Sequence, residues 1–259
     1  MFSNANSFKA KIKNISKDKG IPAQQVQQHY LIEQVLKLIS TSSYRDSFIV
    51  KGGYLIGQMI GLDKRTTMDL DVTLKGTEMS KENLIHIFEE ILCSKTDGFS
   101  LKLNATFDTL KEVVFIDITT GDKITPREIT YSMSSIFTNE SIKIWTYNLE
   151  TVLAEKLETI ISRGLASTRP RDRYDLFTLY KLRKEEINLE VLKNALENTA
   201  EKRKSKDTIY NWEEQVRGIE ISDYQKELWI RYQRQFKYAK DISFDNSVQV
   251  IKEIMQQIF

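Results

Sequence analysis

The sequence predicts an α+β protein, in which a first region with a mixed β-sheet is followed by an α-helical region. Two observations lead to this prediction. Short apolar or alternating runs stand between helical patterns as far as residue 148, and the patterns after residue 149 have mainly helical periodicity. No Gly/Ser-rich linker separates the two parts, so we expect an α+β domain with N-terminal helices over 1–148 and an α-helical domain over 149–259.

The elements follow from local patterns. Apolar residues three and four positions apart predict helices, whereas alternation or a short apolar run ended by glycine predicts a strand. In the first region we expect a helix at 24–40, a buried strand within 46–53 ended by Gly52 and Gly53, a short helix at 54–61, a strand at 66–74, a helix at 81–92, strands at 99–107 and 112–120 with a turn at 107–112, and a strand at 141–147. The second region begins with helices at 148–164 and 169–187.

The composition is that of an ordinary globular protein. Of 259 residues, 41% are hydrophobic and 29% are charged, which is enough to bury a core. No stretch approaches the roughly 18 apolar residues of a transmembrane helix, and the polar N-terminus lacks the apolar block of a signal peptide. We therefore expect a cytoplasmic protein without a membrane partner. One cysteine and two histidines are too few for a Cys- or His-based metal centre, and a net charge of +2 argues neither for nor against a nucleic-acid partner.

Two aspartates lie one residue apart in the strand predicted at 66–74. Because side chains alternate along a strand, Asp69 and Asp71 point to the same face, opposite to the apolar residues. Two ionised carboxylates this close repel each other unless a cation lies between them, and oxygen ligands favour Mg²⁺. For an isolated pair, an exposed edge strand that avoids aggregation is the alternative explanation.

The neighbouring segments favour the metal site. Gly52 and Gly53 open a short helix, a place where backbone N–H groups can bind phosphate. Asp117 stands in a very apolar strand, where a carboxylate needs a partner, and it is the natural third ligand. Three carboxylates that hold two Mg²⁺ ions suit phosphoryl or nucleotidyl transfer. Without metal, three carboxylates buried beside strands would destabilise the fold.

The helices of the second region carry a lysine and two acids in unusual places. Lys156 lies within the apolar stripe of the helix at 148–164, and Arg163 shares its face, so the lysine either extends to water or contributes to a basic cluster. In the next helix, Asp172 and Asp175 share one face. The helix dipole explains Asp172 near the helix start, but Asp175 lies beside apolar residues and is less easily explained. Thr168 is a possible N-cap for this helix.

The remaining aromatic and metal-binding residue types are predicted to be structural. Trp229, Tyr232 and Phe236 fall on one side of a helical pattern and are more often core than a surface for base stacking, although the basic residues beside them could contact RNA. The isolated residues His29, His86 and Cys93 lie in no motif and are interpreted as structural.

Four segments in this order resemble the AbiEii/AbiGii toxin family, whose members are type IV toxin–antitoxin and abortive-infection nucleotidyltransferases with a core similar to DNA polymerase beta. The segments are KGGYLIGQMIGLDKRTTMDLDVTLKG, FIDITTGDKITPREITY, LAEKLETIISRG and RPRDRYDL. The resemblance covers about residues 20 to 185 and implies a nucleotidyltransferase core with a mixed β-sheet. It implies nothing for residues 186–259.

The resemblance also implies roles for particular residues. Asp69, Asp71 and Asp117 match the metal-binding carboxylates, which would hold two Mg²⁺ ions and, through Asp117, help to activate the acceptor hydroxyl. The remaining positions match the nucleotide contacts and the site residues of the helical region: Gly52, Gly53, Arg65, Thr67, Lys156, Arg171, Asp172 and Asp175. Arg65 and Thr67 would make phosphate or structural contacts, Lys156 would bind a nucleotide phosphate, and Asp175 is the more convincing of the two acids.

The implied activity is transfer of NMP from an NTP to an acceptor hydroxyl, with the tRNA 3′ end as the leading acceptor and a cognate antitoxin that need not contact the chain. One departure stands out: the superfamily has Ser or Thr after its glycines, and this chain has Tyr54, so the hydroxyl contact would come from Thr66 or Thr67 or be absent. Two alternatives remain open. The enzyme could modify a protein or small molecule, or the protein could bind nucleotide without turnover.

Overall fold

The computed structural model describes residues 4–92, 101–107 and 110–259. Cys93, the first two residues of the strand predicted at 99–107 and the middle of the turn predicted at 107–112 lie outside the described residues. The chain forms two compact units. We call residues 1–121 with 128–146 the sheet unit, and residues 122–127 with 147–259 the helical unit.

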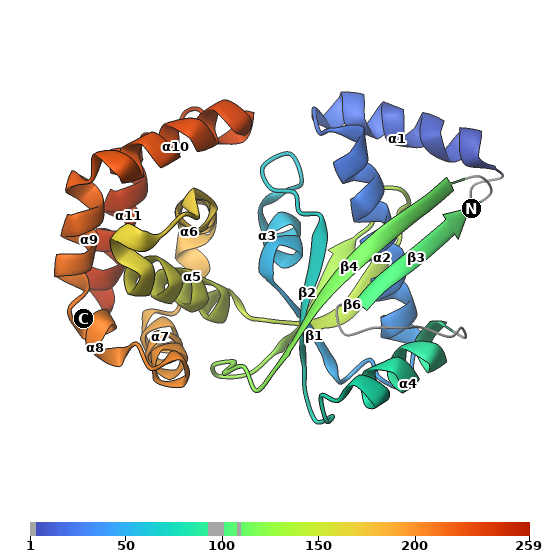
Figure 1. Cartoon of the computed structure of the whole chain (residues 1–259), viewed down its shortest axis with the longest axis horizontal. Coiled ribbons are helices and arrows are strands. Elements are labelled where there is room, and N and C mark those ends of the chain that lie inside the picture. Colours follow the sequence, from blue (N-terminus) through green and yellow to red (C-terminus); the bar gives the residue numbers. More distant parts are fainter. Residues whose placement is uncertain (1–3, 93–100, 108–109) are drawn as a thin grey trace. The chain divides into compact units, whose positions relative to one another are not determined.

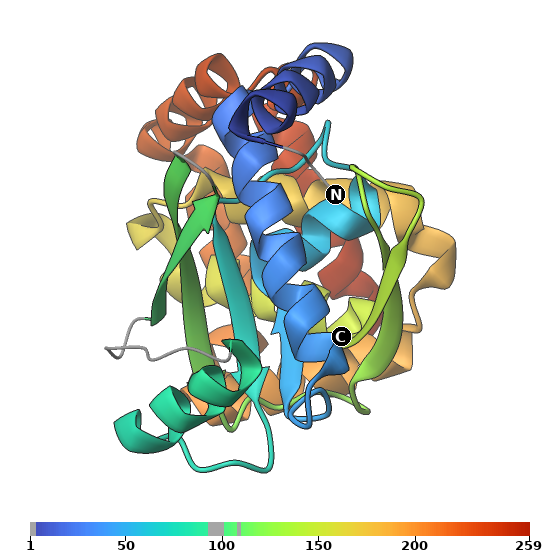
Figure 2. The same cartoon turned by 90° about the vertical axis from the view of Figure 1, so that its right-hand side faces the viewer.

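The sheet unit is built around one mixed six-stranded sheet, in the order β3-β4-β2-β1-β6-β5 (Figures 1 and 2). The pairs β2–β4 and β1–β6 are parallel and the other three are antiparallel, which confirms the predicted mixed sheet. Its elements are α1 (Ala5–Lys19), α2 (Ala23–Thr41), β1 (Phe48–Lys51), α3 (Gly52–Ile60), β2 (Asp69–Leu74), α4 (Lys81–Leu92), β3 (Leu101–Phe107), β4 (Leu110–Thr120), β5 (Ile129–Ser134) and β6 (Ser141–Thr146).

The core of the sheet unit lies on the apolar face of β2. Leu70, Val72 and Leu74 are buried, as the alternation along this strand predicts. Burying one such side chain contributes about 1.5–3 kcal/mol. Helix α2 runs along the sheet (Figure 2), and the Gln28 amide binds the carbonyls of Met68 and Val113 across neighbouring strands. The apolar residues of β2 therefore orient its aspartates toward the opposite face.

Two elements of the sheet unit were not predicted. Helix α1 has a short apolar stripe interrupted by lysines, and it is held by the Asn4 cap and by packing on α2. Strand β5 is largely exposed, with only Met133 buried, so its sequence lacks the alternation of a half-buried strand. It is a strand because it pairs with β6, a contact that local sequence preference does not reveal. Helix α3 also begins at Gly52, two residues earlier than predicted.

The helical unit contains the second region of the chain. Its elements are α5 (Leu149–Arg163), η1 (Gly164–Ala166), α6 (Pro170–Arg183), η2 (Lys184–Glu186), α7 (Leu189–Arg203), α8 (Lys206–Tyr210), α9 (Trp212–Ile221), α10 (Asp223–Gln235), η3 (Lys237–Ala239) and α11 (Phe244–Ile258). The segment 122–127 joins this unit, since the Asn148 side chain at the start of α5 donates to the carbonyls of Thr125 and Arg127 at 2.7 and 2.9 Å. None of the described helices combines the length and the apolarity that a membrane crossing requires.

An aromatic cluster confirms the structural interpretation of the C-terminal aromatic residues. Trp229 and Tyr232 are buried together with Tyr174, and Phe236 packs against them. The Trp229 indole N–H donates to the Ile242 carbonyl at 2.9 Å, which satisfies its polar atom within the core.

His29 is a core histidine and makes the stability of the sheet unit depend on pH. Its ring stacks on Tyr54 of α3, and Tyr54 Oη and Gln58 Nε2 lie 3.5 and 3.3 Å from its Nε2. Burial lowers the pKa of His29 from 6.5 to about 3. The folded state therefore keeps the ring neutral while the unfolded chain takes up a proton below pH 6.5. The free energy of unfolding is expected to fall as the pH is lowered from 6.5 to 5, by up to about 1.4 kcal/mol per pH unit from this residue.

Chemical denaturation at several pH values measures this dependence. His29→Gln is expected to flatten the fall, whereas His86→Gln, at an exposed histidine of α4, is expected to leave it unchanged. Burial also raises the pKa of Glu33, which stabilises the fold at low pH and so acts in the opposite direction. The comparison of each variant with the parent isolates the histidine, and an unchanged slope in His29→Gln would contradict the assignment.

Candidate functional site

The turn from β1 to α3 holds the Asp71 carboxylate against the backbone. The Gly53 N–H group donates to Asp71 Oδ2 at 3.3 Å. Gly52 has a positive φ of 64°, and a Cβ at this position would lie 2.0 Å from Asp71 Oδ2. A glycine is required here for two reasons, because other residues rarely adopt this conformation and because the carboxylate occupies the space of a side chain. The two glycines predicted to bind phosphate therefore also position a predicted metal ligand.

Gly52→Ala is expected to lower the free energy of unfolding by about 1–2 kcal/mol through backbone strain, and also to displace the Asp71 carboxylate. Gly76→Ala is a matched control, since Gly76 has a φ of 70° and open space where a Cβ would lie. Both variants should lose stability in denaturant unfolding through backbone strain, Gly52→Ala more because its Cβ also meets the Asp71 side chain, but only Gly52→Ala should lose catalytic activity. Equal activity in the two variants would contradict a role for the Gly52–Asp71 contact.

The strand register places the three predicted carboxylates on neighbouring strands. Asp71 of β2 stands directly beside Asp117 of β4, and Asp69 lies two residues before Asp71 on the same face. Adjacent strands are about 4.8 Å apart, so this pairing brings two of the three acids to neighbouring backbone positions. Apolar residues on the opposite face of both strands, including Leu70 and Ile116, are buried and support this orientation.

The burial of these acids differs from the expectation. Asp69 and Asp71 are half-buried and Asp117 is exposed, so the cost predicted for three buried carboxylates does not arise. The reason is that the polar face of β4 is open to water at this position, with Phe115 of the same face 43% exposed. Among the described residues, no three His, Cys, Asp or Glu side chains are gathered tightly enough to hold a metal ion. Residue type and backbone position nevertheless fit a Mg²⁺ site, because all three side chains are carboxylates on one face of neighbouring strands.

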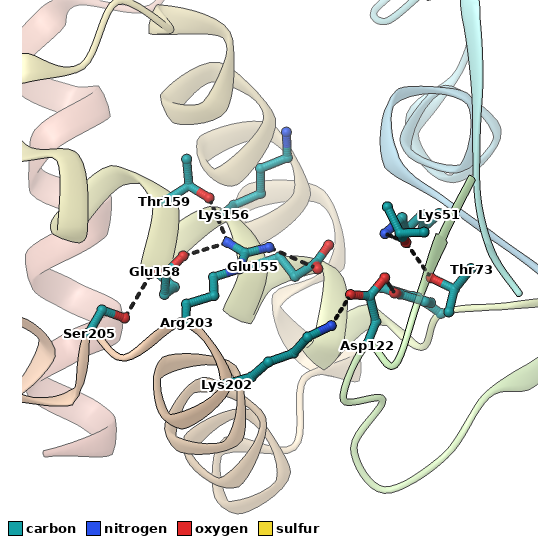
Figure 3. Close-up of polar contacts among 12 residues, drawn as sticks. Lys51, Thr73, Asp122, Glu155, Lys156, Glu158, Thr159, Lys202, Arg203 and Ser205 are labelled. Atoms are coloured by element: carbon teal, nitrogen blue, oxygen red, sulfur yellow. Dashed lines mark hydrogen bonds and ion pairs between the residues drawn. The ribbon is translucent and has the colours of Figure 1, made fainter. Parts of the chain in front are cut away.

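Lys51, the last residue of β1, completes this row of charged residues. It pairs with Asp71 in the strand register, so the order across the sheet is Lys51, Asp71 and Asp117. Its amine donates to Thr119 Oγ1 at 2.7 Å, and Thr119 Oγ1 lies 3.4 Å from the hydroxyl of Thr73, which lies close to Lys51 (Figure 3). A cation therefore lies on the same face as the acids.

The segment just before β2 packs under the glycine turn. Arg65 is buried, with 3% of its surface exposed, and its guanidinium donates to the Thr66 carbonyl. A Cβ on Gly53 would lie 2.8 Å from Arg65 Nη2 and 3.0 Å from Thr67 Oγ1, so these side chains pack directly under the glycine turn. Of the two roles that the resemblance implies for these side chains, a phosphate contact or a structural contact, this packing favours the structural one. Tyr54 is 2% exposed and belongs to the core.

In the helical unit, the structure brings together Lys156, Asp172 and Asp175. The Lys156 amine lies 2.6 Å from Asp172 Oδ1 and 2.9 Å from Asp175 Oδ2. The Asp175 side chain is fully buried, and those of Asp172 and Lys156 are 10% and 17% exposed. Among the described residues, Asp172 Oδ2 is a buried atom without a hydrogen-bond partner. This ion pairing explains why a lysine stands in an apolar stripe. Asp172 Oδ2 has the capacity to accept one more hydrogen bond.

Three details of this region were predicted differently. The N-cap of α6 is Arg169, without a side-chain cap bond, and Pro170 occupies the first turn, so Thr168 is not the cap. Arg163 is exposed at the end of α5, two turns beyond Lys156, and no described ion pair joins it to the acids. Arg171 is exposed, and its guanidinium lies 5.9 Å from the ring centre of Phe236.

Arg203 of α7 holds the acidic neighbours of Lys156 on α5 (Figure 3). Its guanidinium binds Glu158, and it reaches Glu155 Oε1 at 3.1 Å and Thr159 Oγ1 at 3.0 Å. Ser205 donates to the other oxygen of Glu158 at 2.8 Å. These contacts occupy the two glutamates that flank Lys156 in the sequence, whereas the lysine pairs with the aspartates of α6.

Sequence reasoning missed Lys51 and Arg203. A signal was present for Lys51, because a lysine ends an apolar strand directly before the two glycines. No signal was present for Arg203, because it meets Glu155 and Glu158 only through the packing of α7 on α5.

Comparisons with known proteins match both the sequence and the fold of this chain. The family model described as "Nucleotidyl transferase AbiEii toxin, Type IV TA system" matches residues 34–250. The structure of MenT4, a nucleotidyltransferase toxin from Mycobacterium tuberculosis H37Rv, is 14% identical with a TM-score of 0.55 and covers 95% of this chain and 98% of that chain. A nucleotidyltransferase candidate from H. pylori is 13% identical with a TM-score of 0.50, covering 91% and 96%. At these identities the structures share a fold, and none of the curated proteins compared matches the chain.

Proposed function

The chain belongs to the AbiEii nucleotidyltransferase toxin family of type IV toxin–antitoxin systems, and from this premise we propose that it transfers a nucleoside monophosphate to the 3′ end of tRNA. The observation that carries the proposal is the row of charged residues in the sheet unit. Asp71 lies beside Asp117 in the register, Asp69 shares their face, and the Gly53 N–H group binds Asp71. Paired carboxylates suit nucleotidyl transfer, and a glycine turn beside them suits the binding of the NTP phosphates.

In the proposed reaction, a terminal hydroxyl of the RNA attacks the α-phosphate of an NTP. A new P–O bond forms to the acceptor oxygen, the bond to the leaving pyrophosphate breaks, and the hydroxyl proton is lost. Asp117 is the most exposed of the three carboxylates and is the one we assign to the acceptor side, where it would take up this proton. The backbone at Gly52 and Gly53 would bind and orient the phosphates of the NTP.

Asp69, Asp71 and Asp117 would hold Mg²⁺, and we propose two ions, as in other enzymes with paired carboxylates. Bound there, Mg²⁺ would neutralise the charge that accumulates on the phosphates during transfer. The side chains fit this ion chemically, because all three supply hard oxygen ligands. Lys51, whose amine now binds Thr119, is in a position to contact a bound phosphate from the same face.

We further propose that Lys156 binds nucleotide phosphate and that Asp175 positions it. The Lys156 amine is ion-paired on one side by both aspartates, which fixes its direction while 17% of the side chain remains exposed. Arg203 binds Glu155 and Glu158, and so partly neutralises the two glutamates next to the lysine in the sequence. Asp172 and Arg171 are assigned supporting roles in this part of the site.

The proposed partners are an NTP, tRNA and a cognate antitoxin. A type IV antitoxin counteracts its toxin without having to bind it, so we propose no contact surface for it on this chain. Because both substrates are cytoplasmic molecules, we expect the enzyme to act in the cytoplasm. Transfer to a protein or small molecule is the competing proposal for the same carboxylates.

Labelling of RNA with each NTP tests the proposed function. Purified protein is incubated with total RNA, Mg²⁺ and one α-³²P-labelled NTP at a time, with and without a chelator. Label in tRNA-sized RNA, lost with the chelator, is the expected result. Label in protein or in a small molecule would instead support the competing acceptors, and bound NTP without any transfer would indicate a nucleotide-binding protein without turnover.

A further inference from the structure

Helix α1 carries an exposed row of lysines in the sheet unit. Lys9, Lys13 and Lys17 follow one another at four-residue spacing, so they share one side of the helix over a length of about 12 Å. Lys11 and Lys19 are also exposed, whereas the only acidic residue of the helix is Asp18. Within the part of the chain that the structure describes, no ion pair joins these lysines to an acid.

This charge pattern is unfavourable for an isolated helix. Like charges four residues apart repel each other, and the row contains two such pairs, Lys9 with Lys13 and Lys13 with Lys17. The helix dipole favours lysines in the last turn, which accounts for Lys17 and Lys19 but not for Lys9 and Lys13. An anion lying along the row would remove the repulsion. The unfavourable row of like charges is therefore the observation that points to an anionic ligand.

The other side of α1 is already occupied. Phe8, Ile12 and Ile15 are buried in a cluster with Ile21 and Val26. An interfacial membrane helix needs a free apolar face to enter the lipid, and in α1 that face is covered by the protein itself. The exposed side is therefore suited to a polyanion that is contacted through charge alone, and the phosphate backbone of a nucleic acid is such a ligand.

The position of α1 connects this row with the proposed active site. Leu62, which begins the segment leading to Asp69, packs against the cluster under α1. Further along the same segment, the Thr66 hydroxyl donates to Gln25 Oε1 of α2 at 2.7 Å. Figures 1 and 2 both show α1 at the end of α2 near this segment. The matched family region begins at residue 34, so α1 lies outside it.

We propose that the lysine row of α1, defined as Lys9, Lys13 and Lys17, binds the sugar–phosphate backbone of the RNA acceptor. The inference rests on the proposed function, in that it takes the acceptor to be RNA. Each lysine would neutralise one phosphate and release counterions, so affinity would fall steeply with salt and show little dependence on RNA sequence. The row would thereby raise the affinity for RNA without taking part in the chemical step.

Salt-dependent binding of purified total tRNA tests the proposal. The variant carries Lys9→Gln, Lys13→Gln and Lys17→Gln, which keep good helix-forming residues and remove two repulsive pairs. The matched control carries Lys81→Gln, Lys143→Gln and Lys204→Gln, at three other exposed lysines, and loses the same charge. We expect the row variant to bind about tenfold or more weakly at low salt, with the slope of log Kd against log salt reduced by about 2–3. The control should change little.

Transfer kinetics separate this proposal from the function on which it rests. The row variant should raise KM for tRNA by about tenfold or more and leave KM for the NTP and kcat at saturating tRNA unchanged. If the parent protein labels RNA and the row variant binds and labels it equally well, the row proposal is overturned and the proposed function stands. If the parent binds NTP but labels no RNA, the proposed function fails and the row proposal with it. Lysine-dependent binding to phosphatidylserine vesicles, with unchanged tRNA binding, would also overturn it in favour of a membrane surface.

Discussion

Asp71→Asn is expected to reduce nucleotidyl transfer by about a thousandfold or more, which corresponds to ~4 kcal/mol of transition-state stabilisation. The substitution removes the charge of the carboxylate that stands between Lys51 and Asp117 in the strand register. Asparagine keeps the shape of the side chain and an oxygen that can accept the Gly53 N–H group, so the contact that now orients Asp71 can persist. The effect should therefore appear in kcat and not in stability.

The measurement is incorporation of α-³²P-labelled NMP into RNA, together with denaturant unfolding of the same preparations. Asp241→Asn is the control, because Asp241 is an exposed acid of the helical unit to which no role is assigned. We expect the control to keep the parent rate. An Asp71→Asn protein that is folded and transfers NMP within tenfold of the parent rate would remove the carboxylate row from the mechanism.

Lys156→Met is expected to destabilise the helical unit by about 3–5 kcal/mol. The substitution leaves Asp175, which is fully buried, and Asp172, which is nearly so, without the cation that both now bind. Two ionised acids in this position repel each other and have lost water, and one Asp172 oxygen already lacks a partner within the described structure. Methionine fills the volume of the lysine stem, so the loss is assigned to charge rather than to a cavity.

Denaturant unfolding measures this loss, and two further variants isolate its cause. Lys181→Met breaks an ion pair with Glu253 at 3.7 Å, in which both side chains are much more exposed, and should cost at most about 1 kcal/mol. Combining Lys156→Met with Asp172→Asn and Asp175→Asn removes the unpaired charges and should recover most of the stability. If this triple variant folds and still binds NTP as tightly as the parent, the nucleotide role of Lys156 is incorrect. Equal losses for Lys156→Met and Lys181→Met would contradict the buried ion pair.

Local sequence was sufficient for one part of the site. The alternation of β2 and β4 assigned Asp69, Asp71 and Asp117 to polar faces, and the structure has the apolar residues of these strands buried on the other side. This prediction needs only the two-residue period of a strand, a property of the chain itself. Local patterns were also sufficient for α5 and α6, where Lys156 and Asp175 stood out because charged residues interrupt apolar stripes.

Helix α1 shows where local reasoning was insufficient. Its apolar stripe consists of a few residues separated by lysines, and it becomes a helix of the core only where Phe8 and Ile12 pack against residues that follow it. Strand β5 is a similar case, because its pairing with β6 outweighs a sequence with one buried residue. In both elements, the stabilising contacts are made with other parts of the chain, and a short stretch of sequence does not show where those parts lie.

What the sequence alone determined was the identity of the chemical groups and the face of the element on which each lies. Only the tertiary structure decided which of these groups lie together. It places Asp117 beside Asp71, Lys51 in the same row, and Arg203 on the glutamates that flank Lys156 in the sequence. It also decided that the β4 acid is exposed, which the sequence had suggested would be buried. The physical reason is that periodicity is set by backbone geometry within one element, whereas register, burial and ion pairing are set by the packing of elements that are remote in the chain.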